Sequence, residues 1–407
     1  MDYLRFLREN IRWLAAAALV TFSSSYGQTF FISVFAGEIR AEFGLSHGAW
    51  GGIYTLGTSL SAVAMIWAGV LTDHFRVRLL GPVFLGLLAV ACLSMALVPA
   101  GWVLVPVIFA LRFTGQGMLS QIGTVATVRW FVASRGRALS IASLGVAIGS
   151  AALPLMFVAL LGTTGWRTLW VLAAGMVLVA VPALIILLRH ERTPQSLSKN
   201  TQAVGMECKH WQRAEILRHW LFWLMVPTLI GPAAWSTALF FQQVHLTETK
   251  GWAHLDFVSL FPLFTGAMII MTIISGWLID RFSANRVINL YLLPFAAAFV
   301  IIAYSDTLFG AAIGMILVGV SSGIGATVVG AFWAEHCGTQ FIGSIKAMTA
   351  AVMVFGSAIG PGITGWLIDQ GVDFSDQMLW IAVYFLASAV LVLIATNRAR
   401  PLLPATS

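Results

Sequence analysis

Long apolar segments constrain this sequence more than any other feature. A helix that crosses the roughly 30 Å hydrocarbon core of a bilayer needs about 20 apolar residues, and the 407-residue chain contains twelve such segments. Only 10% of the residues are charged, against about 25% in a soluble domain, which excludes a water-soluble globule. The sequence predicts an all-α membrane protein with twelve transmembrane helices, at residues 11–36, 48–71, 79–99, 103–130, 138–161, 168–189, 220–243, 254–279, 286–305, 308–334, 344–368 and 378–397.

The distribution of Lys and Arg orients these spans. Cytoplasmic loops retain positive charge, and with the N-terminus inside, 19 of the 23 Lys and Arg residues fall on the cytoplasmic side. Arg40, Arg167 and Lys250 fall outside, and Arg112 lies within a span. We therefore expect both termini to be cytoplasmic, and the net charge of +7 needs no nucleic-acid partner. The compact loops favour a bacterial inner membrane as the cell membrane that holds the protein.

One long connection divides the spans six and six. Residues 190–219 are polar and basic, and they form a much longer connection than most of the others. A long linker at the midpoint is expected where two bundles are joined. The prediction is an N-terminal six-helix bundle over residues 1–189, a cytoplasmic linker over 190–219 and a C-terminal six-helix bundle over 220–407.

The two halves carry matching motifs at a nearly constant offset, which indicates an internal repeat. Six plus six related spans are typical of transporters, which bind substrate near the midplane between the halves. The matches pair residues 69–78 with 276–286, Gly115-Gln-Gly117 with Gly323-Ile-Gly325, and Gly145-x3-Gly149 with Gly356-x3-Gly360.

These motifs resemble those of the major facilitator superfamily across essentially the whole chain. Residues 69–78 resemble its G-x-L-x-D-R-x-G-R-R loop, with His74 in place of the first Arg and Arg76 in place of the second Gly. The segment from Arg112 to Gly117 is similar to its fourth-span R-x-x-x-G pattern, and residues 356–361 resemble its G-x-x-x-G-P packing motif. The resemblance implies two pseudo-symmetric six-helix bundles and transport by alternating access.

The resemblance also implies a gating site. Asp73 and Asp280 each lie at a cytoplasmic helix end beside arginines, where a carboxylate can pair with a guanidinium or cap a neighbouring helix. In the superfamily such loops latch the halves together in the outward-open state. That role would fall to Asp73, Arg78, Asp280 and Arg281. The alternative is that these charges only anchor helix ends.

A narrower resemblance is to the monocarboxylate and oxalate porter branch. The stretch from Trp130 to Pro154 is similar to that branch's aromatic-F-x3-R-G-x-A-x-G-x-A-x2-G pattern. Tyr26-Gly27, the segment 43–46 and Trp50-Gly51 also occur in the expected order. The resemblance implies a carboxylate substrate.

Arg112 is the one ionisable residue that we place deep in a span, near the membrane midplane. A charge there costs several kcal/mol unless it is solvated or paired, which makes it a functional-site hypothesis. Gln116 and Ser120 follow on the same helical face. If Arg112 lies in a water-filled cleft, with no acid at similar depth, its guanidinium can bind the carboxylate of a substrate in a bidentate manner. The alternative is a structural arginine bonded to carbonyls of the first span or to Gln28.

The first and seventh spans are polar for transmembrane helices, so their polar side chains should line the interior. The cavity candidates are Tyr26, Gln28, Phe31 and Trp235, which join Arg112 and Gln116 as predicted substrate-binding residues; the serines beside them have the alternative role of packing helices closely. Lys346 lies near the cytoplasmic start of the eleventh span. Oxalate-type porters use a lysine in that span, but we expect Lys346 to anchor at the inner surface.

These features predict a secondary transporter that moves a small organic anion, a mono- or dicarboxylate, by alternating access. No carboxylate is predicted at a midplane, so coupling to a proton or a counter-anion stays open. No phosphate-binding loop, catalytic triad or metal cluster occurs, so no enzyme, cofactor or metal is expected. One alternative is an exporter of amphipathic compounds or drugs. An alternative of another class is a transporter-like membrane sensor that binds a ligand without moving it.

Overall fold

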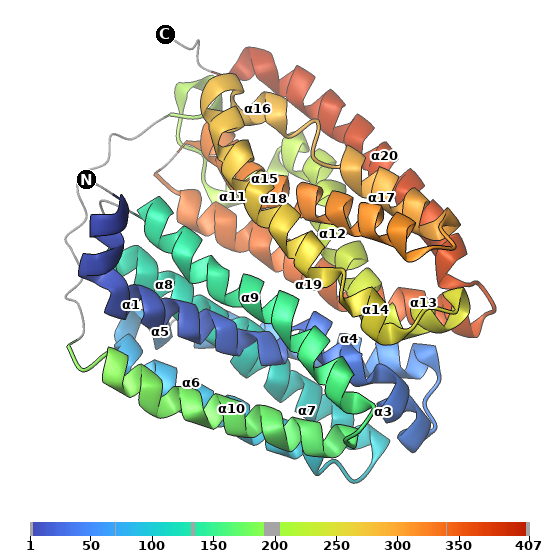
Figure 1. The fold of residues 1–407 in the computed structure, drawn as a ribbon. Coiled ribbons are helices and arrows are strands. Elements are labelled where there is room, and N and C mark those ends of the chain that lie inside the picture. The colour runs from blue at the N-terminus through green and yellow to red at the C-terminus, as the bar shows by residue number, and fades with distance from the viewer. Residues whose placement is uncertain (1–2, 70, 132–134, 191–203, 339, 404–407) are drawn as a thin grey trace. The chain divides into compact units, whose positions relative to one another are not determined.

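The computed structural model describes residues 3–69, 71–131, 135–190, 204–338 and 340–403, and all regular structure in these ranges is helical (Figure 1). Contacts divide the chain into two compact units, residues 1–199 and 200–407.

The N-terminal unit is built from long helices and several short ones. The long helices are α1 (Tyr3–Ser23), α4 (His47–Ala68), α6 (Val77–Ala96), α9 (Arg135–Leu161) and α10 (Trp166–Leu187). The shorter elements are η1 (Ser24–Gly27), α2 (Thr29–Ile32), η2 (Ser33–Phe35), α3 (Ala36–Phe43), α5 (Leu71–His74), η3 (Gly101–Val103), α7 (Leu104–Leu111), η4 (Arg112–Leu119) and α8 (Ser120–Trp130).

The C-terminal unit has the same plan with more regular helices. The long helices are α12 (Trp220–Phe241), α15 (Phe261–Phe282), α18 (Leu308–Cys337), α19 (Ile342–Asp369) and α20 (Phe374–Ala399). The shorter elements are η6 (Met206–Cys208), α11 (Arg213–Arg218), α13 (Gln243–Lys250), α14 (His254–Val258), α16 (Ala284–Val287), α17 (Leu293–Tyr304) and η7 (Arg400–Leu402).

The two units pair their helices in the same order, as the internal repeat predicts. In the N-terminal unit α1 packs on α9, α4 on α7, and α6 on α10 (Figure 1). In the C-terminal unit the corresponding pairs are α12 with α19, α15 with α18, and α17 with α20. Counted by span, the first helix of each unit packs on the fifth, the second on the fourth, and the third on the sixth.

Glycines make the first of these pairings close in both units. A Cβ atom on Gly145 of α9 would lie 2.1 Å from the carbonyl oxygen of Ala18 in α1. A Cβ atom on Gly360 of α19 would lie 2.2 Å from the carbonyl oxygen of Ala234 in α12. Backbone atoms cannot move aside as a side chain can, so only glycine fits at either contact. The repeated G-x3-G motifs therefore serve the same packing role.

Within the described ranges, ten helical stretches are long and apolar enough to cross a membrane. The other two predicted spans are interrupted. The first, predicted as one helix over 11–36, breaks after Ser23 into η1, α2 and η2. The ninth, predicted over 286–305, consists of α16 and α17, and Pro294 occupies the first turn of α17. Proline is favoured at a helix start and cannot donate inside one.

Part of the predicted 190–219 linker is folded. The structure describes residues 204–219, where the backbone N–H of Trp211 donates to the carbonyl of Cys337 at the end of α18, 2.9 Å away. Gln212 and Glu215 form a capping box at the start of α11. The backbone N–H of Gln212, followed by the Lys209 ammonium, lowers the pKa of the exposed Glu215 carboxyl. This part of the chain belongs to the C-terminal unit.

Candidate functional site

The first span of the N-terminal unit is broken at Gln28. The helix tightens over Ser24–Gly27, and Gln28 then adopts an extended conformation, with φ −87° and ψ 154°, before α2 begins at Thr29. At this break the backbone of Gly27 crosses the backbone of Gly115. A Cβ atom on Gly27 would lie 2.1 Å from the carbonyl oxygen of Leu111 and 2.8 Å from the Cα of Gly115. Broken helices at membrane depth are typical of transporter binding sites.

The fourth span is also irregular where it meets this break. Residues Arg112–Leu119 form a π-helical segment between α7 and α8. Such segments are rare and occur frequently at functional sites. The segment begins at Arg112, the residue that the sequence singles out.

Arg112 is buried in the protein, with 1% of its surface exposed. One guanidinium nitrogen, Nη1, donates to the carbonyl oxygen of Gly27 at 3.2 Å and to Oγ1 of Thr29 at 3.4 Å. The guanidinium carbon lies 5.3 Å from the centre of the Tyr54 ring, within the range of a cation–π interaction. Its Nε has no hydrogen-bond partner, and no carboxylate pairs with it, among the described residues. Arg112 thus contacts the broken first span from inside the protein, not from a water-filled cleft.

The other predicted substrate-binding residues belong to different units. Gln28 and Gln116 are half-buried beside the break. Trp235 lies on α12 of the other unit and packs against the Tyr384 ring, with centroids 5.8 Å apart. Its indole nitrogen is buried and has no partner in the described chain.

Tyr26 and Phe31 belong to an aromatic cluster, and Tyr26 also lines a small pocket of about 150 Å³. The Phe31 ring is fully buried, with its centroid 4.8 to 5.2 Å from the ring centroids of Tyr26, Phe157 and Trp170. The Tyr26 hydroxyl points to the Met176 sulfur at 3.5 Å. Edge-to-face aromatic contacts of this kind stabilise a core.

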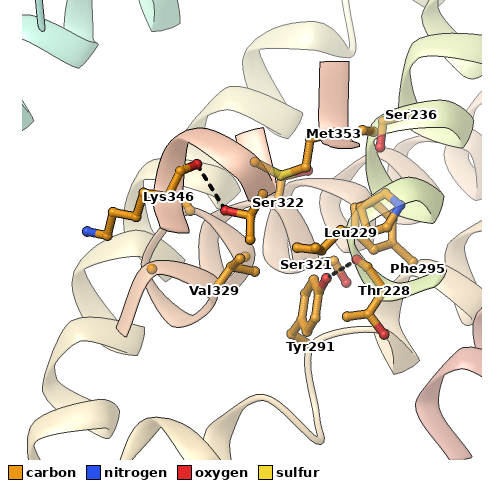
Figure 2. A pocket seen from close by; sticks show the side chains of 16 residues that line it. Thr228, Leu229, Ser236, Tyr291, Phe295, Ser321, Ser322, Val329, Lys346 and Met353 are labelled. Atoms are coloured by element: carbon orange, nitrogen blue, oxygen red, sulfur yellow. Dashed lines mark hydrogen bonds between the residues drawn. The ribbon is translucent and has the colours of Figure 1, made fainter. Parts of the chain in front are cut away.

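A cavity of about 510 Å³ lies inside the C-terminal unit, between α12, α18 and α19 (Figure 2). This volume is within the range of small-molecule sites. Most of its wall is apolar, and no carboxylate occurs among its described lining residues. The lining residues are Thr228, Leu229, Pro232, Ala233, Ser236, Tyr291, Phe295, Ser321, Ser322, Gly325, Ala326, Val329, Gly330, Lys346, Thr349 and Met353.

A proline shapes one wall of this cavity. Pro232 has no N–H, so the carbonyl of Thr228, four residues earlier, has no helical donor. The hydroxyl of Tyr291 donates to that carbonyl instead, at 2.7 Å (Figure 2). The Tyr291 ring is thereby fixed against α12. Gly325 allows the close approach, because a Cβ atom there would lie 3.3 Å from the ring.

Lys346 supplies the one charge among the described residues that line the cavity. Its side chain is exposed and reaches away from Tyr291 and Phe295 (Figure 2). Its Nζ would lie 3.4 Å from a Cβ atom on Gly330. No carboxylate of the described chain pairs with it. The cavity therefore has a cationic end and an apolar body.

The sequence predicts that Lys346 anchors at the inner surface and does not place it among the substrate residues. A signal for the cavity was present in the spacing. Lys346, Thr349 and Met353 follow at i, i+3 and i+7, which places them on one face of α19.

The predicted gating residues lie at helix ends. The structure describes the backbone of Asp73 in α5, but its side chain lies outside the described residues. Arg78 is exposed and donates to the carbonyl of Arg189 at 3.2 Å, within its own unit. Asp280 and Arg281 are exposed at the end of α15, and the Arg281 guanidinium lies 5.5 Å from the Trp277 ring centre.

A carboxylate that the gating prediction omitted caps a helix in this region. Oε2 of Glu335 accepts from the backbone N–H of Ala284 at 2.9 Å, at the start of α16. The sequence suggested this use of a carboxylate for Asp280, but Glu335 performs it from α18.

Comparison with known proteins assigns the class of the chain. Its sequence matches the model of the Major Facilitator Superfamily over residues 17–361 and 263–405. The chain belongs to this superfamily of transporters. A comparison with curated protein sequences gave no match.

Solved structures share the fold. A bacterial homologue of the human lysosomal transporter Spinster, inward-facing and unoccupied, gives a TM-score of 0.73 at 15% identity, over 97% of this chain and 98% of that chain. The occupied form of the same homologue gives a TM-score of 0.71 at 15% identity, over 98% of this chain and 99% of that chain. A mutant of the nucleoside transporter NupG gives a TM-score of 0.70 at 12% identity, over 96% of this chain and 99% of that chain. The predicted all-α fold with two six-helix bundles is confirmed, and the protein is a multi-pass membrane transporter.

Proposed function

We propose that this transporter moves a small organic anion, a mono- or dicarboxylate, by alternating access. The orientation of the spans, with both termini cytoplasmic in a bacterial inner membrane, is part of the proposal and rests on the 19 of 23 basic residues that the sequence assigns to one side. The resemblance to monocarboxylate and oxalate porters supports the same substrate class.

The observation that carries the proposal is the environment of Lys346. The ammonium belongs to a cavity whose described lining holds no other charge, and no carboxylate of the described chain neutralises it. An ammonium at a cavity without a carboxylate partner among the described residues is free to pair with an anionic ligand. A bound organic anion would compensate it.

Arg112 has a different role in this proposal. Its contacts with Gly27 and Thr29 hold the two sides of the break in the first span. Arg112 is therefore a positioning residue, which acts on substrate through the shape of that span. Gln28 and Gln116, half-buried beside the break, are the proposed substrate contacts in the N-terminal unit.

The gating proposal keeps Asp73, Arg78, Asp280 and Arg281 as a latch. Their sequence pattern, repeated in the two halves, supports it. Asp73→Asn is expected to lower transport while the amount of folded protein in the membrane stays the same. Normal turnover of Asp73→Asn would contradict the latch.

Uptake into proteoliposomes tests the substrate class. Labelled acetate, benzoate and succinate are offered with and without a pH gradient, and labelled uridine serves as a neutral polar comparison. We expect uptake of at least one carboxylate above protein-free liposomes and above Lys346→Gln, and none of uridine. A dependence on the gradient would identify a proton as the coupled ion, and exchange with internal carboxylate would identify a counter-anion. Uridine uptake without carboxylate uptake would refute the proposal.

A second candidate is an exporter of amphipathic compounds. It is favoured by the apolar wall of the cavity, where Leu229, Phe295 and Met353 gather (Figure 2). Such an exporter would move neutral and cationic amphiphiles, and Lys346→Gln would not reduce their transport.

A further inference from the structure

We propose that the cavity of the C-terminal unit selects amphipathic monocarboxylates, with the single carboxylate at Lys346 and an apolar aromatic or branched body against α12 and α18. This inference rests on the proposed function and narrows its substrate class. Small polar acids and dicarboxylates would be poor ligands of the same cavity.

The charge in the lining limits the ligand to one carboxylate. Lys346 is the only charged residue among the described residues that line the cavity. A second carboxylate on the same ligand would lie against uncharged wall, without a cation to compensate its desolvation. A dicarboxylate would therefore bind more weakly, because no described lining residue compensates the desolvation of its second carboxylate.

Two hydroxyl groups of the lining already bind backbone carbonyls of the protein. The Tyr291 hydroxyl already donates to the carbonyl of Thr228, and the Thr349 hydroxyl donates to the carbonyl of Lys346 at 3.0 Å. Thr228 and Ser321 keep hydroxyl oxygens that are buried and have no partner in the described chain. These hydroxyls can satisfy a few polar groups of a ligand, but a body with many hydroxyls would leave the rest unsatisfied against the apolar wall.

The apolar wall and the volume fit a larger body. Leu229 and Phe295 lie at the end of the cavity opposite the Lys346 ammonium, and Met353 and Val329 lie between (Figure 2). A cavity of about 510 Å³ exceeds what a small acid such as oxalate or lactate fills. The unfilled space would keep water against apolar surface, so an apolar ligand body gains by displacing it.

The matched ligands are 4-phenylbutyrate, its neutral amide 4-phenylbutanamide, and succinate. Their binding to the purified full-length protein is measured by calorimetry at fixed pH and salt. We expect 4-phenylbutyrate to bind at least about tenfold more tightly than either of the other two.

Variants separate the two ends of the ligand. Lys346→Gln should weaken the binding of 4-phenylbutyrate by about tenfold and leave the binding of the amide unchanged. Lys346→Arg should retain most of the affinity for 4-phenylbutyrate. Met353→Gln, a replacement of similar size, should weaken the binding of the acid and the binding of the amide by the same factor. Thermal stability of each variant, measured without ligand, shows that the protein is folded.

The outcomes distinguish this inference from the proposed function. Tight succinate binding that depends on Lys346, with weak 4-phenylbutyrate binding, would overturn the selectivity and leave the organic-anion function in place. Equal binding of acid and amide, insensitive to Lys346→Gln, would overturn both. A Lys346-dependent preference for 4-phenylbutyrate over succinate and over the amide supports both.

Discussion

The two units place one cation each in opposite settings. In the N-terminal unit, Arg112 is enclosed and bound to the backbone of the broken first span. In the C-terminal unit, the seventh span is a continuous helix, α12, and the exposed Lys346 lines a cavity without a carboxylate partner among the described residues. The first charge is used by the protein itself, whereas the second is available to a ligand.

The repeated glycine motifs show how the difference arises. Gly115 in the N-terminal unit crosses the backbone of Gly27, which brings the fourth span against the first span at its break. In the matching motif of the C-terminal unit, Gly323 contacts α15 and Gly325 faces the Tyr291 ring beside the cavity. Gly115 thus packs on the first span of its unit, whereas its repeat Gly323 packs on the second span of its own unit, α15, and the cavity lies beside α12. Pseudo-symmetry of sequence does not imply the same use of each position.

The largest expected effect is at the crossing of the first and fourth spans. In Gly27→Val, the Cβ atom would lie 2.1 Å from a backbone oxygen, so the two spans must separate. We expect the free energy of unfolding to fall by about 3 kcal/mol or more. The measurement is the yield of monodisperse protein after detergent extraction, which should be low. Gly86→Val, on α6 with nothing within 4 Å of its Cβ position, is the matched control and should extract normally. Normal yield of Gly27→Val would show that the crossing is not as close as described.

A smaller effect is expected when the cavity is filled. Gly325→Val adds side-chain atoms beside the Tyr291 ring, since a Cβ atom at this position would lie 3.3 Å from the nearest ring carbon. We expect binding of 4-phenylbutyrate to weaken by about tenfold, or about 1.4 kcal/mol, with a small change in thermal stability. Unchanged affinity would exclude this cavity as the binding site.

The hydrogen bonds around Arg112 give the next effect. Thr29→Val removes the hydroxyl that pairs with the Tyr54 hydroxyl and with Nη1 of Arg112. Loss of buried hydrogen bonds should lower stability by about 1 to 2 kcal/mol, measured by thermal unfolding in detergent. Thr29→Ser keeps the hydroxyl and should restore most of the stability, and equal loss in both variants would assign the effect to packing.

The smallest effect is expected at the periphery of the N-terminal unit. Arg167 donates to Glu42, with the closest atoms 2.6 Å apart, and lowers the pKa of that carboxyl, with the Trp166 indole adding a second donor. Because the pKa is lowered in the folded state, the pairing stabilises the protein above the unfolded pKa of Glu42 and is lost as the pH falls through the folded value. The exposed pair should contribute less than about 1 kcal/mol.

Unfolding of wild type and Glu42→Gln between neutral and acidic pH measures this contribution. The difference between them should shrink as the pH falls, and a constant difference would mean that the charge is not involved.

Sequence alone predicted the features that depend on composition and periodicity. The spans follow from the apolar content that a bilayer requires, and the repeat follows from glycines whose packing role is the same in both units, as Gly145 and Gly360 show. The break at Gln28 and the π-helical segment at Arg112 were not predicted, because both depend on two distant segments meeting at Gly27 and Gly115.

The site was predicted less well for the same reason. Phe31 lies in a span whose polar residues predict a cavity, but its ring packs in an aromatic cluster with Phe157 of α9 and Trp170 of α10. Lys346 was placed near an inner helix end by its position along the chain. Its place in a cavity depends on where α12 and α18 lie beside α19, which local sequence does not specify.

The central claim is that Lys346 binds the carboxylate while Arg112 positions the broken first span. The direct measurement is equilibrium binding of labelled 4-phenylbutyrate to Lys346→Gln and Arg112→Lys, together with its uptake rate in proteoliposomes. We expect Lys346→Gln to raise Kd by about tenfold, and Arg112→Lys to leave Kd near the wild-type value while uptake slows. A Kd that rises in Arg112→Lys and stays unchanged in Lys346→Gln would contradict the account.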